Sequence, residues 1–266
     1  MIRSLIVTLA ALALAACATP ERSAQLTPET ATASLPHNPS LSAAQIIANA
    51  QAAAGGDVWV RPRTLHLIGE AVFYREGGEV ERHERYEMWR VYPEAKTEAH
   101  RADGQVRIQS WRDGQTALLL AFDGERSYTA AGPQPPSQAD RQWSENFGFG
   151  VIRFALTEGY SQQRLPDDLV DGRPAYVVDV IDPNGGQTQF AIAQENAQIL
   201  RVGFATPRGW HERIYSDFYT HPGSTWVQPG RIRLFYNGVK QNELFWRDFR
   251  LNEEMPDHLF RIEATP

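Results

Sequence analysis

Seven histidines and several acidic pairs are the side chains of this sequence that could bind a metal or transfer protons. The histidines show none of the H-x₃₋₅-H or HExxH spacings that bring two imidazoles to one ion, so we expect no metal site. The tripeptide His-Glu-Arg occurs at residues 83–85 and 211–213. Strand alternation would place its His and Arg on one face and its Glu on the other, and we interpret both copies as a polar outer sheet face. The pair Asp167-Asp168 is interpreted as part of a solvated turn.

The sequence also lacks the usual vehicles of covalent and nucleotide chemistry. It contains no G-x-S-x-G elbow and no glycine-rich nucleotide loop, and its single cysteine, Cys17, lies at the N-terminus. We therefore expect no catalytic residue, no cofactor and no enzymatic activity. An enzyme that uses two carboxylates across a cleft is the alternative that sequence spacing leaves open.

The N-terminus has the pattern of an export signal. Residues 1–16 combine one cation, Arg3, with the apolar run 5–16. As a helix this run would reach about 18 Å, less than the ~30 Å of a bilayer core, so we expect no permanent membrane span there. Cys17 follows Leu14-Ala15-Ala16, and this tetrapeptide resembles the lipobox of bacterial lipoproteins. The alternative is an ordinary signal followed by a stray free thiol.

The lipobox resemblance implies that Cys17 is acylated and anchors the protein to a membrane. The next residue, Ala18, is not the Asp that retains such proteins at the inner membrane. By that resemblance the periplasmic leaflet of the outer membrane is favoured over the inner membrane. Without a second cysteine, the chain can form no internal disulfide in that oxidising compartment.

Composition indicates a tether followed by one folded unit. Residues 17–40 are rich in Pro, Ser and Thr without hydrophobic periodicity, which predicts a flexible tether. Residues 41–266 are expected to form a single domain. The 266-residue chain carries a formal charge of −6, with cations scattered among anions, so a nucleic-acid partner is not expected.

The domain reads as α+β. The alanine-rich segment 41–54 ends at Gly55-Gly56 and predicts a helix. Period-two segments and Asp-Gly or Asn-Gly turns then predict about 10–11 antiparallel strands. The candidate segments for these strands cover residues 63–74, 81–92, 95–101, 105–112, 115–122, 125–130, 175–181, 188–193, 199–205, 210–219, 231–236 and 242–251. The segment 138–160 lacks alternation and predicts one or two further helices.

These features together resemble the LolA/LolB-like lipoprotein-carrier superfamily. The resemblance lies in the capped helix ending in Gly55-Gly56, the first strand 64–69 with its aromatic end Phe73-Tyr74, the Asp-Gly hairpins, and the ending 255–260 with its Phe260. It implies a large curved antiparallel sheet, an unclosed half-barrel, capped by two or three helices. It also implies that an acyl chain lies in the apolar cavity between sheet and helices.

We accordingly expect a lipid, or the acyl chain of a lipoprotein, to be the ligand of a monomeric protein. Period-two alternation places the candidate wall on one sheet face, with aromatic residues of the middle segment as its cover. The candidate ligand-binding residues are Leu65, Leu67, Phe73, Met88, Ile108 and Leu118 from the strands, and Trp143, Phe147 and Phe149 from the cover. The alternative is a sheet filled by its own side chains, which presents its surface to an envelope protein or glycan. An acylated Cys17 disfavours a soluble shuttle and favours a tethered acceptor.

Overall fold

The computed structural model describes residues 40–135, 143 and 148–263. Its first strands are β1 (Thr64–Tyr74), β2 (Val80–Val91), β3 (Gln105–Arg112), β4 (Gln115–Phe122), β5 (Ser127–Thr129) and β6 (Gly132–Pro133). The later strands are β7 (Ser161–Val170), β8 (Arg173–Ile181), β9 (Gln187–Ala193), β10 (Ile199–Thr206), β11 (Gly209–Tyr219), β12 (Gln228–Tyr236) and β13 (Val239–Leu251). The helical elements are α1 (Ala43–Ala54), α2 (Asp57–Val60), and the 3₁₀ turns η3 (Gly148–Arg153) and η4 (Asp257–Phe260).

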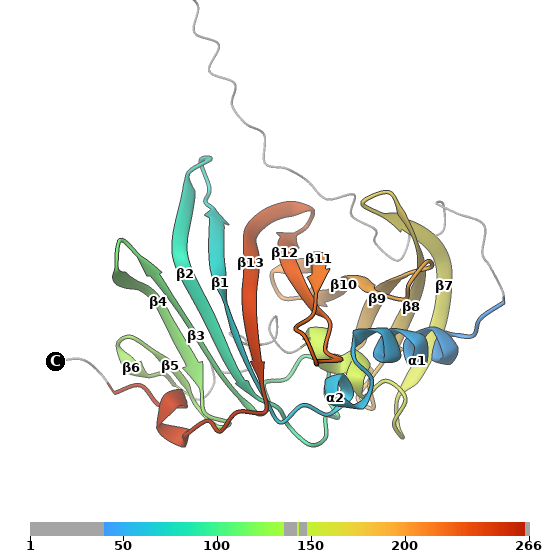
Figure 1. Cartoon of the computed structure of the whole chain (residues 1–266), viewed down its shortest axis with the longest axis horizontal. Helices are drawn as coiled ribbons and strands as arrows, with labels where there is room; N and C mark the ends of the chain where they lie inside the picture. The colour runs from blue at the N-terminus through green and yellow to red at the C-terminus, as the bar shows by residue number, and fades with distance from the viewer. Residues whose placement is uncertain (1–39, 136–142, 144–147, 264–266) are drawn as a thin grey trace, which may run out of the picture.

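All described strands form one antiparallel sheet. Its order is β6-β5-β4-β3-β2-β1-β13-β12-β11-β10-β9-β8-β7, so two meanders meet where β1 pairs with β13. The two outer strands, β6 and β7, are not paired with each other, and the sheet stays open (Figure 1). The expected curved half-barrel with few helices is therefore confirmed, with 13 strands where about 10–11 were expected.

Tight turns connect many of the strands as the dipeptides predicted. Asp113 and Gly114 have φ values of 53° and 74°, and Asn237 and Gly238 have 48° and 76°. Two successive positive φ angles define the type I′ turn, whose twist matches that of the flanking strands. Asp171-Gly172, with 51° and 77°, makes a third turn of this kind between β7 and β8.

Two parts of the strand prediction are wrong. No strand forms at 95–101, because Lys96 Nζ binds Asp103 Oδ2 at 2.6 Å and the carbonyl oxygen of Arg101 at 3.1 Å, which folds this stretch into a loop. The segment around Asp167-Asp168, expected as a turn, instead lies inside β7. Both aspartates are buried there, and Asp168 Oδ2 accepts a hydrogen bond of 2.8 Å from Arg201 Nη1 on β10.

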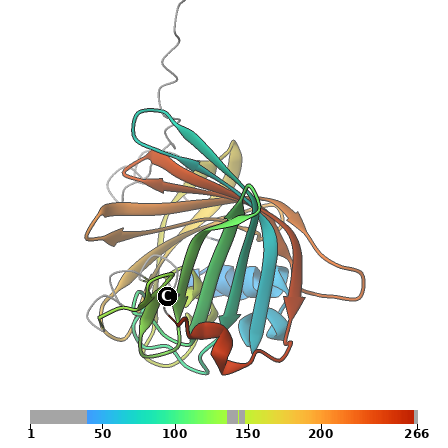
Figure 2. The same ribbon diagram turned by 90° about the vertical axis from the view of Figure 1, so that its left-hand side faces the viewer.

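The helices α1 and α2 lie on the concave side of the sheet (Figure 2). The helix expected at 41–54 is observed as α1, which begins with a capping box: Gln45 N donates to Ser42 Oγ, and Ser42 N donates to Gln45 Oε1. Its face of Ile46, Ile47 and Ala50 is buried in the main core. The side chain of Gln51 joins α1 to η3, because its Nε2 donates to the carbonyl oxygen of Ile152 at 2.8 Å.

The strands of the second meander bury apolar side chains on both faces. Val178 and Val180 of β8 belong to the main core under the helices, while Ala175 and Val177 of the same strand belong to a second cluster. Alternation puts these two sets on opposite faces of the sheet. An ion pair between Arg233 of β12 and Asp171 of the β7–β8 turn closes over this second cluster. The second meander is thus a two-sided scaffold, which fixes the position of its cavity-facing side chains.

Candidate functional site

An apolar cavity of about 230 Å³ lies between the concave face of the sheet and the helices. Its sheet wall includes Leu65 and Leu67 of β1, Met88 of β2, Ile108 of β3, and Leu118 and Leu120 of β4. The register makes this wall continuous: Leu67 faces Met88, Met88 faces Ile108, and Ile108 faces Leu120. A row of cross-strand apolar pairs on one face provides a surface against which a hydrocarbon chain can lie.

Five of the nine side chains proposed from the sequence line this cavity: Leu65, Leu67, Met88, Ile108 and Leu118. Phe73 does not line it. It lies near the hairpin end of β1, where its ring packs 4.7 Å from that of His83. Trp143 is fully buried but lines no part of the cavity, because its Nε1 donates to Ser127 Oγ at 2.9 Å and holds it beside β5. Phe147 and the side chain of Phe149 lie outside the described residues.

The cover of the cavity comes mostly from residues that sequence reasoning missed. Trp59 of α2 and Trp226, which precedes β12, lie over it with ring centroids 6.4 Å apart. Arg153, the last residue of η3, lines the same space. Trp59 and Arg153 belong to elements of four and six residues, which are too short to show a hydrophobic period. Tyr215 and Trp246 also belong to the polar and aromatic part of the lining.

Arg153 is the most unusual group of the site. Its Nε donates a 2.8 Å hydrogen bond to the carbonyl oxygen of Trp59. Its guanidinium carbon lies 4.2 Å from the ring centroid of Trp59, 4.9 Å from that of Tyr92 and 5.7 Å from that of Trp226. Burial lowers the pKa of Arg153, although an arginine remains protonated at any physiological pH. A permanent positive charge thus lies in an apolar enclosure.

Two tyrosines and a second arginine share that enclosure. Burial raises the pKa of Tyr86 and of Tyr215 to about 12, so both hydroxyls remain protonated hydrogen-bond donors. The positive charges of Arg213 and Arg153 lower the pKa of Tyr215 and so oppose the effect of burial. Arg213 lies in β11 and lines the cavity, with its Nε 3.1 Å from Nε2 of His211.

The second His-Glu-Arg tripeptide therefore does not form a polar outer face. His211 is fully buried. The ring of Phe204 stacks on those of both His211 and His100, with centroid distances of 4.6 Å and 4.3 Å. Burial lowers the pKa of His211 well below its usual value, so His211 is neutral and its Nε2 accepts the hydrogen bond from Arg213. Alternation was right, but the His and Arg face points into the molecule.

The first tripeptide departs from the prediction for a different reason. A β-bulge pairs Gly69 with Tyr86 and Ala71 with His83, so that His83 and Tyr86 both point inward and Arg85 points outward. Gly69 permits the close approach of β13 on the other side of β1, where the register also shifts, because a Cβ at this position would lie 2.1 Å from the carbonyl oxygen of Phe245. Arg85 instead lies over the ring of Trp111, 4.4 Å from its centroid.

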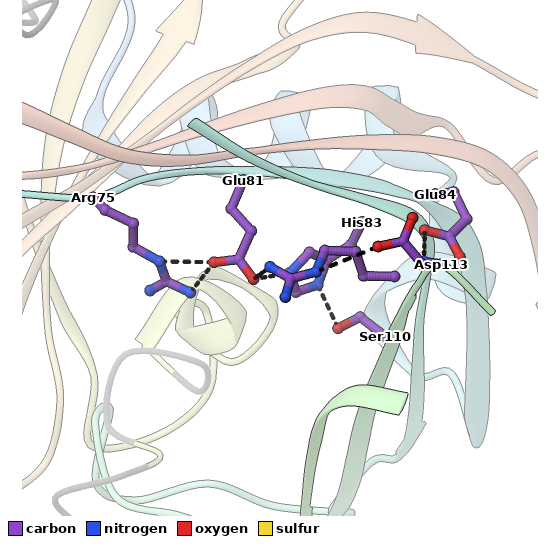
Figure 3. A network of polar contacts seen from close by, with 7 residues as sticks. Arg75, Glu81, His83, Glu84, Ser110 and Asp113 are labelled. Atoms are coloured by element: carbon purple, nitrogen blue, oxygen red, sulfur yellow. Dashed lines mark hydrogen bonds and ion pairs between the residues drawn. The ribbon is translucent and has the colours of Figure 1, made fainter. Parts of the chain in front are cut away.

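His83 belongs to a polar network that links the β1–β2 and β3–β4 hairpins (Figure 3). Its Nδ1 lies 2.7 Å from Ser110 Oγ and its Nε2 lies 3.0 Å from Glu81 Oε1, while Arg75 Nη2 donates to Glu81 Oε2 at 2.7 Å. The order serine, histidine, carboxylate matches that of a hydrolytic triad. Ser110, however, is fully buried and lines no part of the cavity, so this network connects strands and gives a substrate no access.

No group of three or more His, Cys, Asp or Glu side chains in the described part of the chain is placed to hold a metal ion. None of the helices in the described ranges is both long and apolar enough to cross a bilayer.

Comparison with solved structures identifies the fold. A LolA superfamily protein from Nitrosomonas europaea superposes with a TM-score of 0.51 at 15% identity, covering 83% of this chain and 98% of that chain. A DUF1329 family protein from Desulfovibrio piger gives a TM-score of 0.49 at 10% identity, covering 82% and 97%. An outer membrane lipoprotein-sorting protein domain from Vibrio parahaemolyticus gives 0.47 at 13% identity, covering 81% and 94%.

The first of these similarities shows that the chain has the LolA-like fold, as its sequence features suggested. No protein-family model matches the sequence, and no curated protein matches it.

Proposed function

We propose that this protein binds a lipid or the acyl chain of a lipoprotein in the cavity between its half-barrel and its helices. The observation that carries this proposal is the continuous apolar wall from Leu67 through Met88 to Ile108, enclosed by Trp59 and Trp226. Ligand sites are typically concave and mostly apolar, with a few placed polar groups, and this cavity has that composition. The LolA-like fold supports the same conclusion, because the superfamily that the sequence resembles carries acyl chains at this place.

The size of the cavity limits its capacity. About 230 Å³ is slightly less than the ~300–1,000 Å³ of typical small-molecule sites, which favours one hydrocarbon chain. A ligand with several acyl chains would need α1, α2 and η3 to move away from the sheet. These elements are joined to each other by Gln51 and Arg153, so they would move together.

We further propose that the domain is tethered to the periplasmic face of the outer membrane through an acylated Cys17. This rests on the lipobox-like sequence and on Ala18, both of which lie outside the described residues. Metabolic labelling with radioactive palmitate tests it: the wild-type chain should incorporate label, and a Cys17→Ser variant should not. Label in both variants, or in neither, contradicts the anchor.

Two neighbouring leucines of β4 provide a matched test of the cavity. Leu118 lines it, whereas Leu119 packs against a small cluster with Ile262 on the other sheet face. In the full chain carrying Cys17→Ser, Leu118→Trp should weaken binding of dansyl-undecanoic acid by about tenfold or more, while Leu119→Trp should leave it unchanged. Equal effects of the two substitutions would place the probe elsewhere.

Native mass spectrometry of the same chain after purification should show a bound lipid. If it shows none, and the wild-type cavity takes up no probe, the lipid proposal fails. The remaining hypothesis would then be an envelope interaction protein, whose partner crosslinking in cells would recover.

A further inference from the structure

Arg153 carries a charge that the described part of the protein does not balance. Within residues 40–135, 143 and 148–263, no carboxylate lies within ion-pair distance of it, and its partners are the neutral Trp59 carbonyl and three aromatic rings. Only 6% of Arg153 is exposed. Burying an uncompensated charge is costly, so such groups normally pair with an opposite charge or with a ligand.

Three other buried cations of the described chain follow that rule. Lys96 pairs with Asp103 at 2.6 Å, Arg201 with Asp168 at 2.8 Å, and Lys240 with Glu243 at 3.4 Å. Each of these cations is held by a carboxylate of the protein itself, and none of the three lines the cavity. Among the described residues Arg153 differs in both respects, and a ligand in the cavity is placed to supply its counter-charge.

The surroundings of Arg153 contain further donors that face the same space. Arg213 lines the cavity, and Tyr215 lies close enough to both arginines for their charges to act on the pKa of its hydroxyl. Trp246 also lines the cavity, and its indole Nε1 is buried without a hydrogen-bond partner. A buried donor without a partner is costly unless a ligand or water accepts a hydrogen bond from it. Two guanidinium groups, a tyrosine hydroxyl and an indole N–H are a donor set that suits an anion.

We propose that the ligand of this cavity is a single-chain amphiphile with an acidic head group, either a carboxylate or a phosphate monoester. The hydrocarbon chain lies along Leu67, Met88 and Ile108, and the head group pairs with Arg153 and Arg213. This inference rests on the proposed function and adds the charge of the ligand to it. It predicts that an acid binds much better than its uncharged derivative of equal chain length.

The test uses two pairs of probes and the full chain with Cys17→Ser, which is called wild type below because its cavity is unchanged. The first pair is dansyl-undecanoic acid and its methyl ester, which differ only in the charged group. The second pair consists of dodecyl phosphate and dodecanol, measured by displacement of the dansyl acid. Wild type should bind each anionic probe about tenfold or more tighter than its neutral counterpart, since hydrogen bonds to charged groups are the strong ones.

Substitutions then assign the preference to Arg153. Arg153→Met should weaken binding of the acid by about tenfold and leave binding of the ester unchanged. Arg153→Lys should retain part of the preference for the acid over the ester. Arg247→Met is the control, because Arg247 is exposed and pairs with the exposed Glu70 on the surface. It should not change the ratio of the two affinities.

The outcomes separate this inference from the proposed function. Equal binding of acid and ester by wild type overturns the acidic head group while leaving a lipid cavity in place. Binding of neither probe overturns the proposed function itself. The wild-type comparison decides the matter even if Arg153→Met does not fold. The ratio of anionic to neutral affinity is then compared between the two probe pairs. A larger ratio in the phosphate pair identifies the head group as a phosphate, and a larger ratio in the carboxylate pair identifies a fatty acid.

Discussion

Arg153 Nε and the carbonyl oxygen of Trp59 form a 2.8 Å hydrogen bond that joins η3 to α2. The two residues are 94 positions apart in the chain, and their side chains also stack, with the guanidinium 4.2 Å from the indole. One contact therefore connects two covering elements that otherwise belong to different parts of the sequence. Because both side chains line the cavity, the stability of the cover and the shape of the binding space depend on the same pair.

Trp59→Ala should remove the main side chain that α2 contributes to the core. Trp59 is buried against Trp226 and Arg153, and truncating such a residue typically costs about 3–5 kcal/mol. Urea unfolding of the full chain should show this loss. Val58→Ala in the same short helix is the control, since Val58 is exposed and its substitution should change stability by no more than about 0.5 kcal/mol. Equal losses would mean that α2 is not anchored by its tryptophan.

Asp168→Asn should be strongly destabilising, because it removes the closer of the two buried carboxylates that pair with Arg201 inside the second meander, the other being Glu212 at 4.0 Å. Both side chains are almost fully buried, and breaking such a pair typically costs about 3–5 kcal/mol. Glu70→Gln provides the comparison, because its pair with Arg247 is exposed and should contribute less than about 1 kcal/mol. Calorimetric melting of both variants measures the difference. A mild effect of Asp168→Asn would show that Glu212 or water compensates the charge of Arg201.

The buried histidines predict a loss of stability at mildly acidic pH. Burial lowers the pKa of His100 from 6.5 to about 4, so the unfolded chain binds this proton between pH 6.5 and 4 while the folded chain does not. The corresponding stability is fully present above pH 6.5 and is lost as the pH falls towards 4. His100→Gln should reduce the pH slope of the unfolding free energy by about one proton over this range.

The remaining slope in His100→Gln should come largely from His211, whose pKa is also lowered by burial. His258→Gln is the control, because His258 is exposed. Chemical unfolding at pH 4.5, 5.5, 6.5 and 7.5 gives the slopes. An unchanged slope in His100→Gln would mean that this ring is protonated in the folded protein.

Glu81 predicts a second, more acidic transition. Hydrogen bonds from His83 and Arg75 lower its pKa from 4.5 to about 2. Its contribution to stability is therefore present above pH 4.5 and is lost as the pH falls to 2. Glu81→Gln should flatten the stability curve in that range and leave the His100 range unaffected. The same pH series, extended to pH 2, distinguishes the two groups.

The sequence was sufficient for most of the sheet and for most of its inner wall, because both depend on local periodicity. Alternation correctly put Leu65, Leu67 and Met88 on one face, and the glycine turns located most hairpins. It could not identify β7, because Asp167-Asp168 resembles a solvated turn until Arg201, 33 residues away, supplies the buried charge. Burial of a charged residue depends on partners distant in sequence, which a local pattern does not contain.

The residues that cover the cavity, and the charge of Arg153 among them, could not be predicted from local sequence patterns for a similar reason. Trp59 and Arg153 lie in elements too short to show a hydrophobic period. Their role in the cover is visible only from their contact with each other across 94 residues. The inward direction of His211 and Arg213 depended on which sheet face carries the helices. Alternation sorts residues into two faces but does not say which of the two is inside.

The pairing of β1 with β13 has a consequence for how the chain assembles. Leu65 lies opposite Leu251, so the centre of the sheet joins the first strand to the last. Each meander consists of neighbouring hairpins and can form early, but the two halves share their central ladder only after nearly the whole chain has left the ribosome. Contacts of such long sequence separation slow folding. Until β13 is made, β1 keeps an unpaired edge, which is open to pairing with another copy.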